Sequence, residues 1–275
     1  MGKKYNEWLL VSDIDGTLND KQFKLPPNNR AAINRFVEMG GNFTLCSGRN
    51  LQSLKVHYDN LGIKTPAIFS NGAGIYDFGT DKLIFLDTHS TEGEDILYDI
   101  FRKSKWLQLT VFGVNTIYLT KRTCFYGWVI SKMDKLNYKL CKTKEDLPSG
   151  EWTKVSFFGS PSKLKKLQNM LKSDKYNKYF DCFLTSRFTL EVVKAGVNKG
   201  SGVKMLTEYL GINPENVGAI GDYYNDVKML QHVSHPVCCG QAPDDIKSIC
   251  EHVTCHCNDG AVCEFINYIE KNYIT

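Results

Sequence analysis

The sequence has no apolar run long enough to cross a membrane. Among its 275 residues, no stretch approaches the roughly 18 consecutive apolar residues of a spanning helix. The first residues, MGKKYNEW, lack the apolar segment of a secretory signal, and Asn6 stands where a myristoylation site needs Ser or Thr. We therefore expect a cytoplasmic protein with no membrane partner.

An excess of charge of one sign is also missing. Lys and Arg number 34 and Asp and Glu number 30, which gives a net charge of +4. The basic residues are scattered, with only small clusters such as Lys163, Lys165 and Lys166. This pattern is too weak to predict a nucleic-acid partner. A composition of 42% hydrophobic and 23% charged residues is typical of a globular chain with a buried core.

Cysteine is plentiful, with ten residues, which we expect to be reduced and to pack as small apolar side chains. One group near the C-terminus invites a metal interpretation; its members are Cys250, His252, Cys255, His256, Cys257 and Cys263. Their spacings form C-x-C and H-x-x-x-H fragments and not the paired C-x-x-C of zinc sites. The alternative, which we favour, is a short strand from Val253 to Cys257 followed by a loop and a helix.

Strand and helix patterns alternate in two parts of the chain. Apolar strand runs in WLLVSDIDG, NFTLCSGR and PAIFSNGA are separated by the helical patterns PPNNRAAINRFVEMGG and LQSLKVHYDNLG. From Asn198 the alternation resumes, with ENVGAIGD as its first strand. This order predicts an α/β fold whose doubly wound, mostly parallel, Rossmann-like sheet is covered on both faces by helices.

The pattern between these parts differs. After a hairpin around Gly79 come adjacent strand runs such as LQLTVFGV and NTIYLT, then the helix SPSKLKKLQNMLKS with Ser160 as N-cap, and the strand pair YFDCFLTS and FTLEVV. Neighbouring strands of this kind indicate an antiparallel sheet. We predict an α+β domain at 86–190, inserted into one α/β core formed by 1–85 and 191–275.

Ligands of open α/β sheets bind beyond the carboxyl ends of the strands. The residues that follow predicted strands or begin a helix at that edge are Asp13, Asp15, Gly16, Thr17, Ser47, Gly48, Arg49, Asn71, Gly72, Lys199, Asp222, Asn225 and Asp226. Asp13 and Asp15 lie two residues apart, so on a strand they would point to the same side and repel unless a positive group lies between them.

These residue types fit phosphoryl chemistry. Carboxylate oxygens suit Mg²⁺, which would neutralise Asp13 and Asp222, while Ser47, Lys199 and backbone amides would hold an anionic group. One aspartate can attack phosphorus while Asp15 carries the proton. Gly16 allows the sharp exit from the strand, and Thr17 is in a position to hydrogen bond to Asp15.

The residues resemble, in order, the four motifs of the haloacid dehalogenase superfamily: DIDGTL at 13–18, SGR at 47–49, the lysine of NKG at 198–200 and GDYYND at 221–226. The place of the insert, after SNGA, resembles the type IIB cap of the Cof-like phosphatase branch. Two departures are Ser47, where Thr is commoner, and CCGQAP at 238–243, where the family has a Met-Asn-Ala-like segment.

The resemblance implies that Asp13 is the nucleophile and Asp15 the general acid and base. It assigns Mg²⁺ to Asp13, Asp222 and the main-chain carbonyl of Asp15, with Asp226 supporting the metal site. The phosphate would be held by Ser47, Gly48, Lys199 and Asn225.

Other residues allow two interpretations. Asn71 either lines the site or belongs to an ordinary Asn-Gly turn, and Arg49 either contacts substrate or pairs with an acid. In the insert, a sugar or a second phosphate could be contacted by Lys121, Arg122, Tyr126 and Arg187, which could equally be exposed surface.

The sequence therefore predicts a Mg²⁺-dependent phosphatase for small phosphorylated metabolites, with sugar phosphates as first guess and nucleotide or cofactor phosphates next. A phosphomutase and a non-catalytic regulator that binds a phosphorylated metabolite are the alternatives. Neither the natural substrate nor the oligomeric state follows from the sequence.

Overall fold

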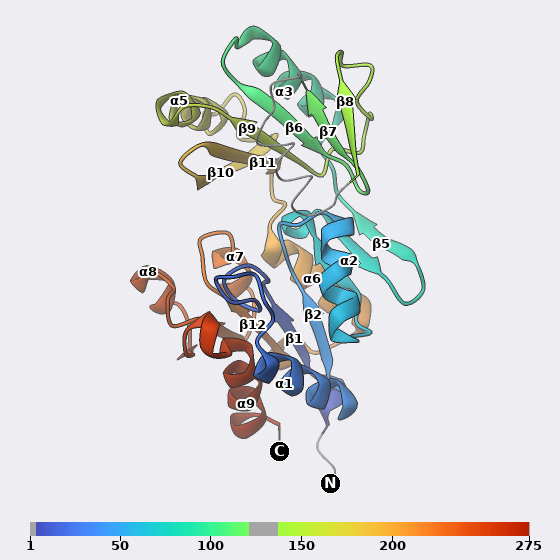
Figure 1. Cartoon of the computed structure of the whole chain (residues 1–275), viewed down its shortest axis with the longest axis vertical. Coiled ribbons are helices and arrows are strands. Elements are labelled where there is room, and N and C mark those ends of the chain that lie inside the picture. Colours follow the sequence, from blue (N-terminus) through green and yellow to red (C-terminus); the bar gives the residue numbers. More distant parts are fainter. Residues whose placement is uncertain (1–3, 121–136, 275) are drawn as a thin grey trace. The chain divides into compact units, whose positions relative to one another are not determined.

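The computed structural model describes residues 4–120 and 137–274 (Figure 1). The chain forms two compact units. The first contains residues 4–48, 54–84 and 198–274, and the second contains 49–53 and 85–197. Within the described ranges, no helix combines the length and the apolar character needed to cross a membrane.

The first unit is built on a five-stranded sheet in the order β14-β13-β12-β1-β2, in which all neighbours are parallel. The strands are β1 (Leu9–Ser12), β2 (Asn42–Leu45), β12 (Val217–Gly221), β13 (His235–Cys238) and β14 (His252–Val253). In the interior strand β1, which pairs with β12 and β2, every residue is buried, because helices cover both faces and water is excluded from either side. This sheet confirms the predicted fold class.

The helices of this unit are α1 (Pro27–Glu38), α6 (Lys199–Leu210), α7 (Val227–Leu230), α8 (Asp244–Lys247) and α9 (Ala261–Asn272); α2 (Leu51–Leu61) begins in the second unit. Helices α1 and α9 pack side by side, with Ile33 and Phe36 buried on one and Phe265 and Ile266 on the other (Figure 1). Arg35 joins them through a 2.6 Å ion pair to Glu270.

The third predicted strand does not belong to the parallel sheet. Strand β3 (Ala67–Phe69) joins a separate three-stranded sheet with β4 (Gly74–Asp77) and β5 (Lys82–Leu86), and meets the end of β2 only in a parallel bridge between Cys46 and Ile68. The cause is the turn at 70–72, where Ser70, Asn71 and Gly72 have positive φ and the chain reverses onto β4. The predicted hairpin around Gly79 is present, and Asp77 accepts a 2.8 Å hydrogen bond from the Gly79 amide.

Strand β14 is shorter than the predicted strand from Val253 to Cys257. It ends at Val253, because the Cys255 amide donates to the side chain of Glu264, at 2.7 Å, and not to a neighbouring strand. The prediction placed the strand correctly but extended it too far.

The second unit has a six-stranded sheet in the order β10-β11-β9-β6-β7-β8. Its strands are β6 (Gln108–Phe112), β7 (Ile117–Thr120), β8 (Tyr138–Cys141), β9 (Lys154–Phe158), β10 (Phe180–Ser186) and β11 (Thr189–Lys194). The predicted antiparallel pairing is confirmed for all neighbours except β7 and β8, which are parallel. Helices α3 (Thr91–Lys103) and α5 (Pro161–Leu171) pack on one face of this sheet, over a core that includes Leu109, Val111 and Phe157. Ser160 is the N-cap residue of α5, as predicted, although its side chain makes no capping hydrogen bond.

Helix α6 begins with a reciprocal cap that determines where Lys199 lies. The Asn198 side chain accepts from the Ser201 amide at 3.0 Å, and the Ser201 hydroxyl accepts from the Asn198 amide at 3.0 Å. Two amides of the first turn, which have no partner within the helix, are thereby satisfied. The helix ends at Gly211 in the left-handed conformation.

We expect Asn198→Ala to lower the free energy of unfolding by about 1 kcal/mol, because the first turn of α6 loses its cap. Asn198→Ser retains a capping oxygen and should lose less. Urea denaturation of the two variants and the parent measures the difference. Equal stability of Asn198→Ala and the parent would show that the cap contributes nothing.

Candidate active site

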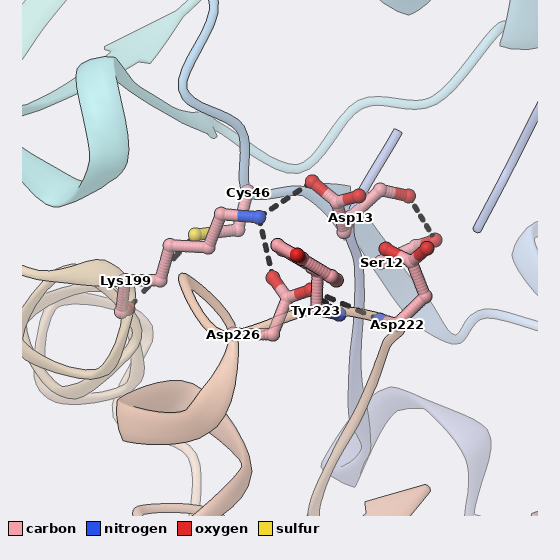
Figure 2. Close-up of polar contacts among 7 residues, drawn as sticks. All are labelled: Ser12, Asp13, Cys46, Lys199, Asp222, Tyr223 and Asp226. Atoms are coloured by element: carbon pink, nitrogen blue, oxygen red, sulfur yellow. Dashed lines mark hydrogen bonds and ion pairs between the residues drawn. The ribbon is translucent and has the colours of Figure 1, made fainter. Parts of the chain in front are cut away.

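Three carboxylates meet at the carboxyl ends of β1 and β12 (Figure 2). Asp13 follows β1, and its amide still donates to Ile220 of β12 at 3.1 Å. Asp222 follows β12, and Asp226 precedes α7. The three side chains each offer an oxygen within 4.8 Å of the others, so the predicted acidic cluster is present in the first unit.

Asp15 does not share a strand face with Asp13, which differs from the expectation. Strand β1 ends at Ser12, and the chain then turns, with the amides of Leu18 and Asn19 donating to the carbonyls of Asp13 and Ile14. Asp13 is 5% exposed, whereas Asp15 is exposed to solvent. Residues i and i+2 point to the same side only within a strand, and β1 ends one residue before Asp13, so the rule does not apply to Asp13 and Asp15.

Lys199 is the positive group at the centre of the cluster. Its ammonium lies 2.5 Å from Asp13 Oδ1 and 2.5 Å from Asp226 Oδ1, and its side chain is completely buried. Burial alone would lower the pKa of Lys199, but the two carboxylates outweigh burial and raise it. Lys199 therefore stays charged and holds the start of α6 against the ends of β1 and β12.

Both carboxylate oxygens of Asp226 have protein partners. Oδ1 accepts from Lys199, and Oδ2 accepts from the amides of Asp222, at 3.0 Å, and Tyr223, at 3.1 Å (Figure 2). The side chain packs against Gly221, where a Cβ atom would lie 2.5 Å from Asp226 Cγ. Asp226 thus shapes the 222–223 turn and orients Lys199.

The cluster carries more negative than positive charge. Three carboxylates face one ammonium, so the formal charge is three negative less one positive, or −2. Burial and the neighbouring Asp226 raise the pKa of Asp222 to about 7. Burial also raises the pKa of Asp13, with Lys199 opposing the shift and the other acids adding to it. One divalent cation would balance the charge, and oxygen donors of this kind suit Mg²⁺. Asp13 and Asp222 are the better ligands, because both Asp226 oxygens already accept hydrogen bonds.

Gly16 makes room for Asp222. It has φ of +82°, and a Cβ atom built on it would lie 2.5 Å from Asp222 Oδ2. Position 16 therefore needs glycine for two reasons: the backbone is left-handed there, and the Asp222 carboxylate approaches too closely for a Cβ atom. The buried Thr17 hydroxyl lies beside the same carboxylate and opposes the rise of its pKa.

Ser47, Gly48 and Asn71 lie together beyond β2 and β3. The buried Ser47 donates its amide to Ile68 at 3.0 Å, and its carbonyl accepts from the Asn71 amide at 2.9 Å. A Cβ atom on Gly48 would lie 2.9 Å from Asn71 Oδ1, so the Asn71 side chain packs directly on Gly48.

The remaining predicted residues have separate surroundings. Arg49 belongs to the second unit and donates to the Ser53 hydroxyl at 2.6 Å. Asn225 is half-buried in the loop between Asp222 and Asp226. Arg187 lies over the ring of Phe188, 5.6 Å from its centre. The other insert candidates lie outside the described residues; they are Lys121, Arg122 and Tyr126.

The sequence did not predict the role of Gln241, which contacts the cluster from the loop after β13. Its Nε2 donates to the Gly16 carbonyl at 2.6 Å and lies 3.5 Å from Asp222 Oδ2. The segment 238–243 stood out only as a departure from the family pattern. The rule that site residues follow strands would have included Gln241, had it been applied to β13 as well.

The cysteine and histidine residues near the C-terminus take part in local contacts. His252 pairs with Glu264 at 3.1 Å and stacks on Tyr268, and His256 accepts from the Asn258 amide at 3.1 Å. Within residues 4–120 and 137–274, the acidic cluster is the one group of three such side chains that meets the geometry of a metal site.

Comparison with known proteins identifies the family to which this chain is similar. A family model described as haloacid dehalogenase-like hydrolase matches residues 10–266. An HMP-PP phosphatase from Serratia proteamaculans is 28% identical, and the match covers 97% of each chain. The 5-amino-6-(5-phospho-D-ribitylamino)uracil phosphatase YcsE from Bacillus subtilis is 26% identical, over 90% of this chain and 89% of the relative. A solved haloacid dehalogenase-like hydrolase from Bacteroides thetaiotaomicron superposes with a TM-score of 0.86 at 23% identity, covering 95% of this chain and 99% of the other.

We expect Lys199→Met to destabilise the cation-free protein by about 3–5 kcal/mol at neutral pH, because buried carboxylates lose their counter-charge. Lys204→Met is the matched control, since Lys204 lies on the same helix with its side chain 61% exposed. The control should change stability by less than about 0.5 kcal/mol. Urea denaturation in EDTA measures both.

The loss of stability in Lys199→Met should increase as the pH rises. Without Lys199, the raised pKa values of Asp13 and Asp222 rise further, so the folded variant binds more protons than the unfolded chain. Its stability should therefore fall as the pH rises from about 5 to about 8, more steeply than in the parent. A pH-independent loss would contradict this charge account.

Proposed function

The chain belongs to the haloacid dehalogenase-like hydrolases, as the motifs indicated, and from this premise we propose that it is a Mg²⁺-dependent phosphatase of small phosphorylated metabolites. The observation that carries the proposal is the buried Asp13, held at 2.5 Å by Lys199 and close to Asp222. An acid in this position is a suitable nucleophile, because its carboxylate is oriented and lies beside groups that attract a phosphoryl anion. The curated relatives named above are also phosphatases of small molecules.

Asp13 and Asp222 would hold the cation, together with the main-chain carbonyl of Asp15. The donor set fits Mg²⁺, since all the side-chain donors are oxygens and the cluster has a formal charge of −2 before the cation is added. When bound, the ion would offset the charge of the phosphoryl group and of Asp13, which otherwise repel each other.

In the proposed reaction, Asp13 is the nucleophile and Asp15 carries the proton. An oxygen of Asp13 attacks phosphorus, the bond from phosphorus to the ester oxygen breaks, and Asp15 gives its proton to the departing alcohol. Asp15 then accepts a proton from water, whose oxygen attacks the aspartyl-phosphate and releases phosphate from Asp13. The exposure of Asp15 suits this role, because a proton carrier must reach both the leaving group and water.

Further residues would orient the phosphoryl group. Lys199 contributes a fixed positive charge, and Ser47 and Asn225 contribute a hydroxyl and an amide. The turn residues Gly16, Thr17, Gly48 and Asn71 would shape the surroundings, and Arg49 would contact the substrate. Asp226 would support the metal site indirectly, through the partners of its two oxygens.

We assign substrate selection to the inserted domain at 86–190, in the manner of a type IIB cap. The relatives are named for HMP-PP and for a phosphorylated ribitylaminouracil, and a structural neighbour with a TM-score of 0.81 is a subclass IIB sugar phosphatase. Sugar phosphates and the phosphates of cofactor precursors therefore form the first substrate panel.

Asp13→Asn should abolish phosphate release from p-nitrophenyl phosphate and from this panel, by at least about a thousandfold, because the amide cannot form the aspartyl-phosphate. Asp59→Asn, at an exposed carboxylate paired with Lys55, is the control and should leave the rate unchanged. Release of phosphate by the Asp13 variant at the parental rate would refute the mechanism. Transfer of phosphate between positions of one sugar, without free phosphate, would identify a phosphomutase instead.

Mg²⁺ should raise the Tm of the parent more at about pH 8 than at about pH 6. The reason is that Asp222 has a pKa of about 7, so protons compete with the ion below that pH. Thermal unfolding with Mg²⁺ and with EDTA measures the shift. An equal shift at both pH values, or none at either, would count against the proposed metal site.

A further inference from the structure

The side-chain amide of Gln241 connects three segments around the acidic cluster. Its Nε2 donates to the carbonyl of Gly16 at 2.6 Å and lies 3.5 Å from Asp222 Oδ2. Its Oε1 accepts from the amide of Cys257 at 3.0 Å. One side chain therefore contacts the turn after β1, the residue after β12 and the loop after β14.

The surroundings determine which way the amide points. The Gly16 carbonyl can only accept a hydrogen bond, as can the Asp222 carboxylate when it is ionised, and the Cys257 amide can only donate one. The NH₂ group must therefore face Gly16 and Asp222, and the oxygen must face Cys257. A flipped amide would place oxygen against oxygen on one side and NH₂ against NH on the other.

The contact matters because Gly16 and Asp222 leave each other little room. Asp222 Oδ2 lies 2.5 Å from where a Cβ of Gly16 would be, so a small shift of either group moves the other. The NH₂ of Gln241 lies against an oxygen of each and limits both movements. The NH₂ group also places donor hydrogens near the Asp222 carboxylate, which lies close to Asp13 and Asp226.

We propose that Gln241 is a positioning residue for cation binding: it holds Asp222 and the Gly16 turn in the arrangement that binds a divalent cation, without touching the substrate. The inference rests on the proposed function, which supplies the cation. Groups that orient metal ligands typically change metal affinity by about 10- to 100-fold when they are removed.

Three substitutions separate the features of the side chain. Gln241→Ala removes all three contacts. Gln241→Asn keeps the amide but is one methylene shorter, so it cannot reach Gly16 and Cys257 together. Gln241→Glu keeps the length and an oxygen for Cys257, but replaces the donor NH₂ by an oxygen that repels the Gly16 carbonyl and Asp222.

The experiment is calorimetric titration of Mn²⁺ into the full chain without substrate. We expect Gln241→Ala to weaken Mn²⁺ binding by about 10- to 100-fold and Gln241→Asn to weaken it as well. Gln241→Glu should also bind more weakly, although its added negative charge would by itself attract the cation. Gln231→Ala, at the exposed C-cap glutamine that follows α7, is the matched control and should bind like the parent.

Mn²⁺ binding by the Gln241→Ala or Gln241→Glu variant as tight as in the parent, or tighter, would overturn the inference, and so would a parent that binds no Mn²⁺. A parent that binds Mn²⁺ but releases no phosphate would refute the proposed function alone, because the titration does not depend on turnover.

Activity gives a second readout. If the parent is active, the Mg²⁺ concentration for half-maximal rate should rise in Gln241→Ala by the factor seen for Mn²⁺, while the KM for substrate at saturating Mg²⁺ stays unchanged. A purely structural role would instead lower the Tm of the cation-free variant and leave the Mg²⁺ dependence as in the parent, which would overturn the inference.

Discussion

The buried ammonium of Lys199 is the interaction on which the rest of the site depends. An unpaired charge at this depth would be far too costly, so the folded chain must bring carboxylates to it. Asp13 and Asp226 meet that requirement at 2.5 Å each; Asp13 directly follows β1, and Asp226 precedes α7 in the segment after the neighbouring strand β12. The capped start of α6 supplies the lysine from a third direction. The lysine is therefore paired only where the start of α6 and the segments after β1 and β12 come together.

The same cluster has more carboxylates than ammonium groups, and this excess of negative charge favours the binding of a cation. Lys199 satisfies one oxygen of Asp13 and one of Asp226, while Asp222 forms no ion pair with a basic side chain of the described residues and has a raised pKa. A divalent cation would complete the charge balance and leave a site suited to a phosphoryl anion. Glycines make the crowding possible: Gly16 and Gly221 each lie where a Cβ would collide with one of these carboxylates.

Much of this architecture could be predicted from the sequence, because strand periodicity and the rule that site residues follow strands both depend on local spacing. Asp13, Lys199, Asp222 and Asp226 are therefore found together, as expected. The features that the sequence did not predict depend on contacts between distant residues, which the spacing of residues along the chain does not reveal. Strand β1 ends before Asp13 because the chain turns there, β3 leaves the sheet through a left-handed turn, and Gln241 acts through hydrogen bonds to residues more than two hundred positions away or in another loop.

The central claim is that Asp13, held by Lys199, receives the phosphoryl group. The most direct test is to quench the protein in acid during turnover and to locate any bound phosphoryl group by peptide mass spectrometry. The account predicts the added mass on the peptide that contains Asp13, and its absence from the Asp13→Asn variant. A phosphoryl group on another residue, or phosphate release with no phosphorylated peptide at any quench time, would contradict it.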